Sequence, residues 1–139
     1  MKKDNKGFSL VELIIVIAIM AILIVVVAPQ YLKYVEKSRI SVDQDNAGEI
    51  GRAMQIYAAD QGNPATEAVI EVTPSGITAP TAGSWAEGAL DNAGLKAGDA
   101  DIKSKNASWA TAGKYQVKFG TDGSLTFDPT DIANSDYTP

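Results

Sequence analysis

The side chains best suited to bind an ion lie in two groups of aspartates in the second half of the chain. Asp99 and Asp101 form one group, and Asp122, Asp128 and Asp131 form the other. Oxygen-rich loops of this kind can hold calcium, but neither group has the spacing of an EF-hand. Aspartates in solvated loops are therefore the favoured interpretation, and a calcium site is the alternative.

The composition disfavours most other chemistry. The 139 residues include no cysteine and no histidine, so a disulfide framework, a thiolate zinc site and the commonest general base near pH 7 are all missing. No nucleophile lies beside a base, and no glycine-rich loop has phosphate-binding spacing. We therefore expect neither an enzyme nor a cofactor. The formal charge is -5, so direct nucleic-acid binding is not expected either.

One further carboxylate, Glu12, lies where a charge is costly. It interrupts an apolar run from Phe8 to Ala28, which as a helix at about 1.5 Å per residue is long enough to cross a hydrocarbon core of about 30 Å. A carboxylate buried in hydrocarbon costs at least about 2.5 to 3.5 kcal/mol. Two interpretations follow: the Glu12 side chain reaches the headgroups of a plain membrane anchor, or it has a partner that compensates its charge.

A cleaved secretory signal is a third interpretation of the same run. A basic segment precedes the run, and Val26, Val27 and Ala28 resemble a cleavage site of small residues. Pro29 would then follow the cut directly, where its ring and missing N–H obstruct an extended protease substrate. Ordinary secretion is therefore disfavoured.

The segment KGFSLVELIIVIAIMAILIVVVAP resembles the class III signal of type IV pilins and of type II secretion pseudopilins. The shared features are a short basic leader that ends in glycine, then phenylalanine, then glutamate as the fifth mature residue, in an apolar helix with a proline near its end. The resemblance covers residues 6 to about 60. It is specific in its first eight positions.

This resemblance implies processing and assembly. A prepilin peptidase is expected to cut between Gly7 and Phe8 and to methylate the new amino terminus of Phe8. In a bundle of staggered helices, the Glu12 carboxylate of one copy would pair with the Phe8 amine of a neighbour. In the family, the proline equivalent to Pro29 lies in a stretch that loses helix on assembly.

A long helix must position these residues. Polar and apolar residues after Tyr31 alternate with a helical period, and Gly62 followed by Pro64 marks a stop, so we expect a helix from Phe8 to about Ala59. Bending or local melting is expected near Pro29. The expected apolar stripe consists of Leu32, Val35, Val42, Ile50, Ala53, Met54 and Tyr57.

The rest of the chain predicts a small β-rich head. We expect a strand over residues 69–73 continued at 77–78, a helix from Trp85 to about Gly94 capped by Ser84 and Glu87, and a hairpin with strands 115–119 and 125–127. The stripe of the long helix would cover the sheet. The expected fold is therefore α+β and pilin-like, with four parts: a leader (1–7), a membrane half-helix (8–30), an amphipathic half-helix (31–61) and a head (62–139).

The predicted function is that of a pilin, which polymerises with its own copies into an extracellular filament for adhesion or twitching motility. The expected partners are prepilin peptidase, an assembly platform and its ATPase. The precursor would cross the plasma or inner membrane once, with Lys33, Lys37 and Arg39 at the headgroups.

Two alternatives stay open. The first is a major pseudopilin of a type II secretion or competence DNA-uptake system; such proteins bind calcium in a C-terminal loop, which keeps calcium near Asp99, Asp101, Asp122 and Asp128 under consideration. The second is a membrane-anchored binding module that does not polymerise. The absence of a C-terminal cysteine pair disfavours one class of Gram-negative pilins and is compatible with both Gram-positive pilins and pseudopilins.

Overall fold

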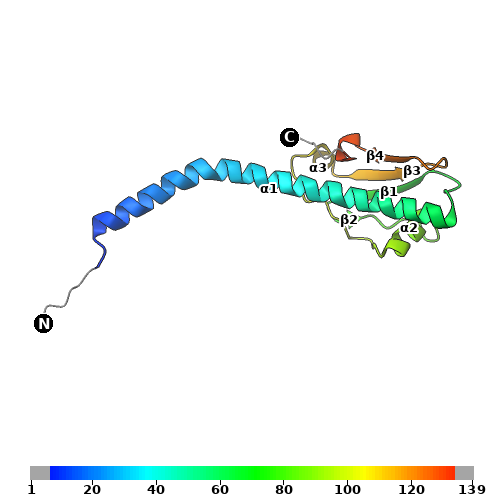
Figure 1. The fold of residues 1–139 in the computed structure, drawn as a ribbon, viewed down its shortest axis with the longest axis horizontal. Coiled ribbons are helices and arrows are strands. Elements are labelled where there is room, and N and C mark those ends of the chain that lie inside the picture. The colour runs from blue at the N-terminus through cyan, green and yellow to red at the C-terminus, as the bar shows by residue number, and fades with distance from the viewer. Residues whose placement is uncertain (1–6, 134–139) are drawn as a thin grey trace. The chain divides into compact units, whose positions relative to one another are not determined.

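The computed structural model describes residues 7–133. It has a 52-residue helix, α1 (Leu10–Gln61), followed by a region that contains a four-stranded sheet, two short helices and a 3-10 turn (Figure 1). The chain divides into two compact units, with the boundary between Val35 and Glu36. We describe each unit by itself. The predicted functional boundaries at residues 7, 30 and 61 stay predictions.

Helix α1 begins and ends close to where the sequence predicts. It starts at Leu10, two residues later than expected, because Ser9 caps its first turn. It continues to Gln61, two residues past Ala59, and ends where Gly62 adopts a φ of 82°. The N–H of Gly62 donates to the carbonyl of Ala58 over 2.8 Å, a bond that closes the last turn.

Pro29 lies inside α1, and the helix is continuous through it. Of the expected bending or local melting near Pro29, the melting is therefore wrong for the single chain. A proline removes one backbone hydrogen bond and crowds the preceding turn, and α1 continues through this loss although Val25, Val26 and Val27 before it are weak helix formers. A loss of helix on assembly stays a prediction.

The four strands form one antiparallel sheet in the order β2-β1-β3-β4. Strands β1 (Ala68–Thr73) and β2 (Gly76–Ile77) form a tight hairpin, and β1 also pairs with β3 (Tyr115–Phe119), with Ile70 opposite Val117. Strand β4 (Leu125–Asp128) completes the predicted late hairpin through a turn at Gly123, where φ is 85°. The predicted α+β class is confirmed.

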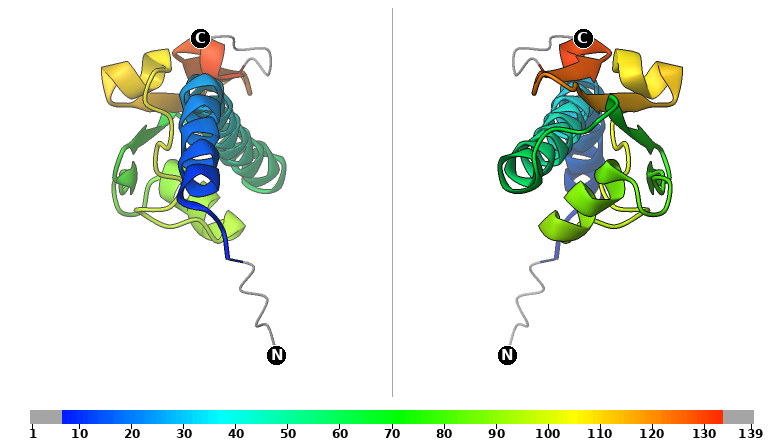
Figure 2. Two further views of the ribbon diagram at one scale, coloured as in Figure 1. Left: turned by 90° about the vertical axis from the view of Figure 1, so that its left-hand side faces the viewer. Right: turned by 90° about the vertical axis from the view of Figure 1, so that its right-hand side faces the viewer.

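The core lies between one face of the sheet and the C-terminal part of α1, which lie side by side in both views of Figure 2. Ile50 and Met54 of α1 are completely buried against residues such as Ile70 and Val117. The predicted stripe is partly wrong, because Val42 is 41% exposed. The buried face of α1 consists of Glu36, Ile40, Asp43, Ala47, Ile50, Gly51, Ala53 and Met54.

Helix α2 (Trp85–Ala93) confirms the predicted cap. The Ser84 hydroxyl accepts the N–H of Glu87 over 3.2 Å, and Gly94 ends the helix with a φ of 72°. The Glu87 carboxylate reaches back to the N–H of Gly83 rather than to that of Ser84, at 2.5 Å. Two further short elements, α3 (Ser108–Ala112) and η1 (Thr130–Ala133), lie at the two ends of the β3–β4 hairpin in the chain.

Candidate processing and assembly site

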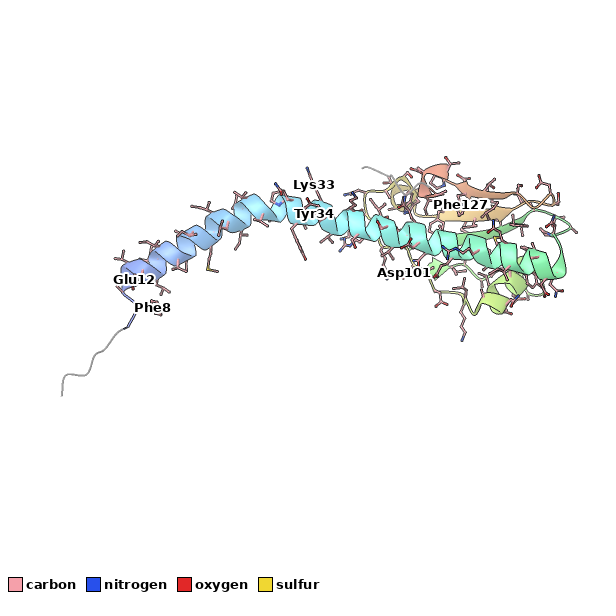
Figure 3. The ribbon with its side chains drawn as sticks, in the orientation of Figure 1. Phe8, Glu12, Lys33, Tyr34, Asp101 and Phe127 are labelled. Atoms are coloured by element: carbon pink, nitrogen blue, oxygen red, sulfur yellow. The ribbon has the colours of Figure 1, made fainter. Side chains whose placement is uncertain are left out.

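The first turn of α1 contains a reciprocal cap formed by Ser9 and Glu12. The N–H of Ser9 donates to Oε2 of Glu12 over 3.0 Å, and the N–H of Glu12 donates to Oγ of Ser9 over 3.2 Å. These two bonds satisfy two of the backbone donors that every helix start leaves unpaired. Figure 3 shows Glu12 in this first turn with Phe8 just ahead of it.

The cap gives the Glu12 carboxylate a partner inside its own chain, which the sequence analysis did not include. A carboxylate in the first turn also benefits from the positive end of the helix dipole, by about 0.3 to 1 kcal/mol near a surface. The signal was present in the sequence, because Ser-Leu-Val-Glu has the spacing of a capping box. Ser9 and Glu12 together therefore define the start of α1.

The Gly7–Phe8 peptide bond lies outside the helix. Residues 7–9 are not helical, the Phe8 side chain is 93% exposed, and a Cβ added to Gly7 would meet no atom within 4 Å. A protease binds its substrate in an extended form, which a helical segment cannot provide without unfolding. The geometry around Gly7 and Phe8 therefore fits the predicted cleavage without further rearrangement of this chain.

The N-terminal unit presents an almost continuous apolar surface. The large apolar side chains between Leu10 and Val27 have exposed fractions from 51% to 74%, and α1 is long and apolar enough to cross a membrane. An apolar surface of this size marks contact with lipid or with other chains. Glu12 is the one acidic or basic residue between Leu10 and Val27.

In the C-terminal unit, two buried carboxylates of α1 hold a loop by its backbone. Asp43, 1% exposed, accepts the N–H of Lys103 at 2.7 Å, the N–H and hydroxyl of Ser104 at 3.1 and 2.5 Å, and the indole N–H of Trp109 at 2.9 Å. Glu36, 7% exposed, accepts the N–H groups of Lys105 and Asn106 at 2.5 and 2.7 Å. We call Glu36 and Asp43 the carboxylate clamp.

The clamp explains why acidic residues lie on the buried face of α1. The two residues are seven apart, or about two helical turns, so both side chains point the same way. Burying a carboxylate is costly unless hydrogen bonds compensate its charge, and here six donors do so. The sequence analysis missed the clamp because it assigned charged residues to solvent. The available signal was the spacing: Glu36, Asp43 and Ile50 follow one another at intervals of seven residues and so lie on the same face of the helix.

Comparison with known proteins gives the chain a family. Residues 2–28 match the family described as "Prokaryotic N-terminal methylation motif". The fimbrial protein EcpC of Eikenella corrodens is 33% identical over 100% of this chain and 91% of its own length. The chain belongs to the type IV fimbrial protein family. The predicted resemblance to type IV pilins is thereby confirmed, and the chain is a structural subunit rather than an enzyme.

Two further relatives agree with this family. A type IV major fimbrial protein FimA of Dichelobacter nodosus is 31% identical over 91% of this fimbrial protein and 79% of its own length. Prepilin peptidase-dependent protein A of Clostridium perfringens (strain 13 / Type A) is 33% identical over 53% of this chain and 54% of its own length. No solved structure matches the chain.

The predicted aspartates of this fimbrial protein each have a local partner. Asp99 accepts the N–H of Lys96 at 2.8 Å, and Asp101 pairs with Lys103 at 2.7 Å. Asp122 accepts the hydroxyl of Ser124, a bond that lowers the pKa of the Asp122 carboxyl and fixes the turn. Asp128 pairs with Lys118 at 3.3 Å, and Asp131 accepts the hydroxyl of Ser108 at 2.6 Å.

These aspartates do not gather at one point. Within residues 7–133, no group of three or more acidic side chains is arranged to hold a metal ion. Each carboxylate instead has a hydrogen-bond or ion-pair partner in its own chain. Calcium binding by this fimbrial protein stays an untested alternative.

Tyr115 carries a pH-dependent prediction. Burial, followed by the charge of Asp43, raises the pKa of the Tyr115 phenol, and its buried hydroxyl has no hydrogen-bond partner in the part of the chain that the structure describes. An unfolded chain loses this proton near pH 10, whereas the folded chain keeps it. The unfolded state therefore binds fewer protons above that pH, so stability falls as the pH rises above about 10.

We expect Tyr115→Phe to remove this part of the loss of stability at alkaline pH. At pH 7 the variant should be as stable as the wild type or slightly more so, because a buried hydroxyl without a partner is removed. Urea denaturation of the full chain in detergent, measured from pH 7 to 11, checks both points. An alkaline limb that is identical in the two proteins would contradict the assignment.

Proposed function

We propose that this fimbrial protein is a pilin that loses residues 1–7, is methylated at the amino group of Phe8, and polymerises through its apolar half-helix into a surface filament. The observation that carries the proposal is Glu12. It is the one ionisable group in an exposed apolar surface that otherwise carries no charge, and it is the fifth residue after the expected cut.

The proposed assembly step exchanges one partner of Glu12 for a stronger one. In the single chain the carboxylate accepts one hydrogen bond from an uncharged donor, the N–H of Ser9. Removal of the leader creates a cationic amine at Phe8, which is costly in an apolar environment unless an anion compensates it. The amine of a neighbour offers Glu12 a hydrogen bond together with an opposite charge, whose Coulomb attraction is large in a dry interface. Each subunit therefore gains when its neighbour docks.

The proposed pair of the Glu12 carboxylate and a neighbour's Phe8 amine also sets how far neighbouring helices are displaced along each other. Apolar side chains alone pack in several registers at similar cost, whereas a charge left unpaired in a dry interface costs several kcal/mol. Pro29 is proposed to act later, by allowing α1 to lose helix where subunits pack. Fixing the register, more than adding stability, is the proposed role of Glu12.

The proposed cellular setting follows from the family. The precursor crosses the plasma or inner membrane once, prepilin peptidase processes it, and an assembly platform with its ATPase extends the filament, which serves adhesion or twitching motility. The relatives in Eikenella corrodens and Dichelobacter nodosus are named as fimbrial proteins. These names favour the pilus over the pseudopilus of a secretion or DNA-uptake system.

Electron microscopy of material sheared from the cell surface tests the proposal. We expect filaments in which mass spectrometry finds this chain as the main component, and no filaments in a strain that lacks it. Long surface filaments that form without the chain would contradict the pilin assignment. A chain that stays in the membrane fraction as monomers would favour the anchored binding module instead.

A further inference from the structure

The exposed face of α1 in the C-terminal unit carries charges that have no ion-pair partner among the described residues. Lys37, Asp45 and Arg52 are exposed, and none of them forms an ion pair within residues 7–133. Asp60 is exposed too, and its carboxylate binds only the neutral amide of Gln61. Glu49, between Asp45 and Arg52, is a further exposed carboxylate. The signs along the exposed face are thus positive at 37, negative at 45 and 49, positive at 52 and negative at 60.

The spacing of these charges repeats. Lys37 precedes Asp45 by eight residues, and Arg52 precedes Asp60 by eight residues. At about 1.5 Å per residue, eight residues correspond to about 12 Å along the helix axis. Two parallel copies of α1 displaced by about 12 Å would therefore place both cations of one copy beside both anions of the other.

The two charge pairs also fit around the helix axis. At about 100° per residue, Lys37 and Arg52 lie within about 60° of each other, as do Asp45 and Asp60. The anionic side is turned by about 80° from the cationic side, and the two sides adjoin, because Arg52 and Asp45 are only about 20° apart around the axis. A copy presents the cationic side to one neighbour and the adjoining anionic side to the next. Such a contact between different surfaces does not close on itself, and it generates a helical filament.

Gly48 provides a second observation on the cationic side. It lies between Lys37 and Arg52, where a Cβ would meet no atom of the described residues within 4 Å, so packing among residues 7–133 does not require glycine. Glycine in a helix interior is destabilising relative to alanine. Gly48 lines a hollow of about 290 Å³, together with Arg52 of α1 and with Phe127 and Ile132 of the head, into which a side chain of a neighbouring copy can reach.

We propose that this face of α1 binds α1 of a second copy in parallel, displaced by eight residues, with Lys37 against Asp45 and Arg52 against Asp60. An antiparallel pair would also match these charges. The parallel direction is argued from the proposed function, in which all copies leave the same membrane with the same end first. The inference rests on the proposed polymerisation and adds the register of a contact outside the membrane half-helix (8–30).

Charge reversal tests the pairing. Lys37→Glu and Asp45→Lys should each lower the yield of sheared filaments at least tenfold, because like charges face each other across the contact, and the double variant should recover to within about threefold of wild type. Lys96→Glu, at an exposed head residue, is the matched control and should change little. If Lys37 acts only as a headgroup anchor, the double variant will not recover, and this outcome overturns the proposal.

Cysteine cross-linking tests the register, because the chain has no cysteine of its own. The variant Lys37→Cys/Asp45→Cys should give a ladder of disulfide-linked oligomers in oxidised filaments. Within one helix these two positions are too far apart to be bridged. Lys37→Cys/Asp60→Cys should give no ladder; a ladder from this pair would show antiparallel copies and overturn the proposal.

The proposed function and the eight-residue register can be refuted separately. If wild-type cells form no filaments of this chain, the proposed function fails. If filaments form but neither the charge reversals nor the Lys37/Asp45 cross-link behaves as stated, only the eight-residue register fails.

Discussion

Glu12→Ala should abolish filament formation while leaving cleavage at Gly7 and membrane insertion largely intact. The variant removes a charge from the apolar surface, so the precursor enters the membrane at least as readily. The amine of Phe8 in a neighbour then has no anion to pair with, and a charge left alone in a dry interface costs several kcal/mol per subunit. Filament yield in sheared fractions and the size of the processed chain on gels measure the two effects.

Two control variants separate pairing from capping, since Glu12 also caps α1. Ser9→Ala removes half of the cap, at a cost of about 1 kcal/mol, but keeps the carboxylate; it should keep filament yield within about threefold of wild type. Glu12→Gln keeps an acceptor for the N–H of Ser9 but loses the charge, and it should fail like Glu12→Ala. A Ser9→Ala variant as defective as Glu12→Ala would show that the role of Glu12 is only local.

Asp43→Ala should be the most destabilising substitution in the C-terminal unit. It removes the acceptor of four hydrogen bonds from Lys103, Ser104 and Trp109 and leaves a cavity beside them. Each buried donor without a partner costs about 1 to 3 kcal/mol, and removing one side of a buried charged network costs about 3 to 5 kcal/mol in comparable cases. Small domains are stable by only about 5 to 15 kcal/mol.

Urea denaturation of the full chain in detergent, followed by tryptophan fluorescence, measures this loss. Asp43→Asn keeps the shape but presents an amide donor to other donors, so it should lose an intermediate amount. Asp45→Ala, two residues away and exposed, is the matched control, with a change within about 0.5 kcal/mol. If Asp43→Ala is no less stable than Asp45→Ala, the clamp has no part in stability.

The sequence predicts the regular elements of this fold well, because their signals are local. The stop at Gly62, the Ser84 cap and the hairpin turn at Gly123 each depend on residues within a few positions of one another. The α+β class also followed from period and turn chemistry. These elements agree with the structure to within two residues at the ends of α1.

The features that the sequence analysis missed depend on contacts between distant segments. Asp43 is buried because Lys103 and Ser104, about 60 positions later, donate to its carboxylate. If every aspartate is placed in solvent, the helical period assigns Val42, rather than Asp43, to the buried stripe. The Ser9–Glu12 cap is different: it is local, and the spacing alone could have predicted it.

The candidate site divides in the same way. Gly7, Phe8 and Glu12 follow from a short motif, on which the proposed cleavage and pairing rest. The partners of Asp99, Asp101 and Asp122 do not follow from spacing, because one-residue differences in a loop decide whether a carboxylate faces a lysine, a serine or an ion. The acidic loops left calcium open as an alternative to solvated aspartates, and spacing alone does not decide between the two.

The amino-terminal residue of the chain in sheared filaments tests the central claim most directly. Mass spectrometry of the intact subunit and of its first peptide should show a chain that begins at Phe8 with one methyl group on its α-amine. A filament subunit that begins at Met1, or that begins after Ala28, would contradict the account, because neither form presents the Phe8 amine to a neighbour's Glu12.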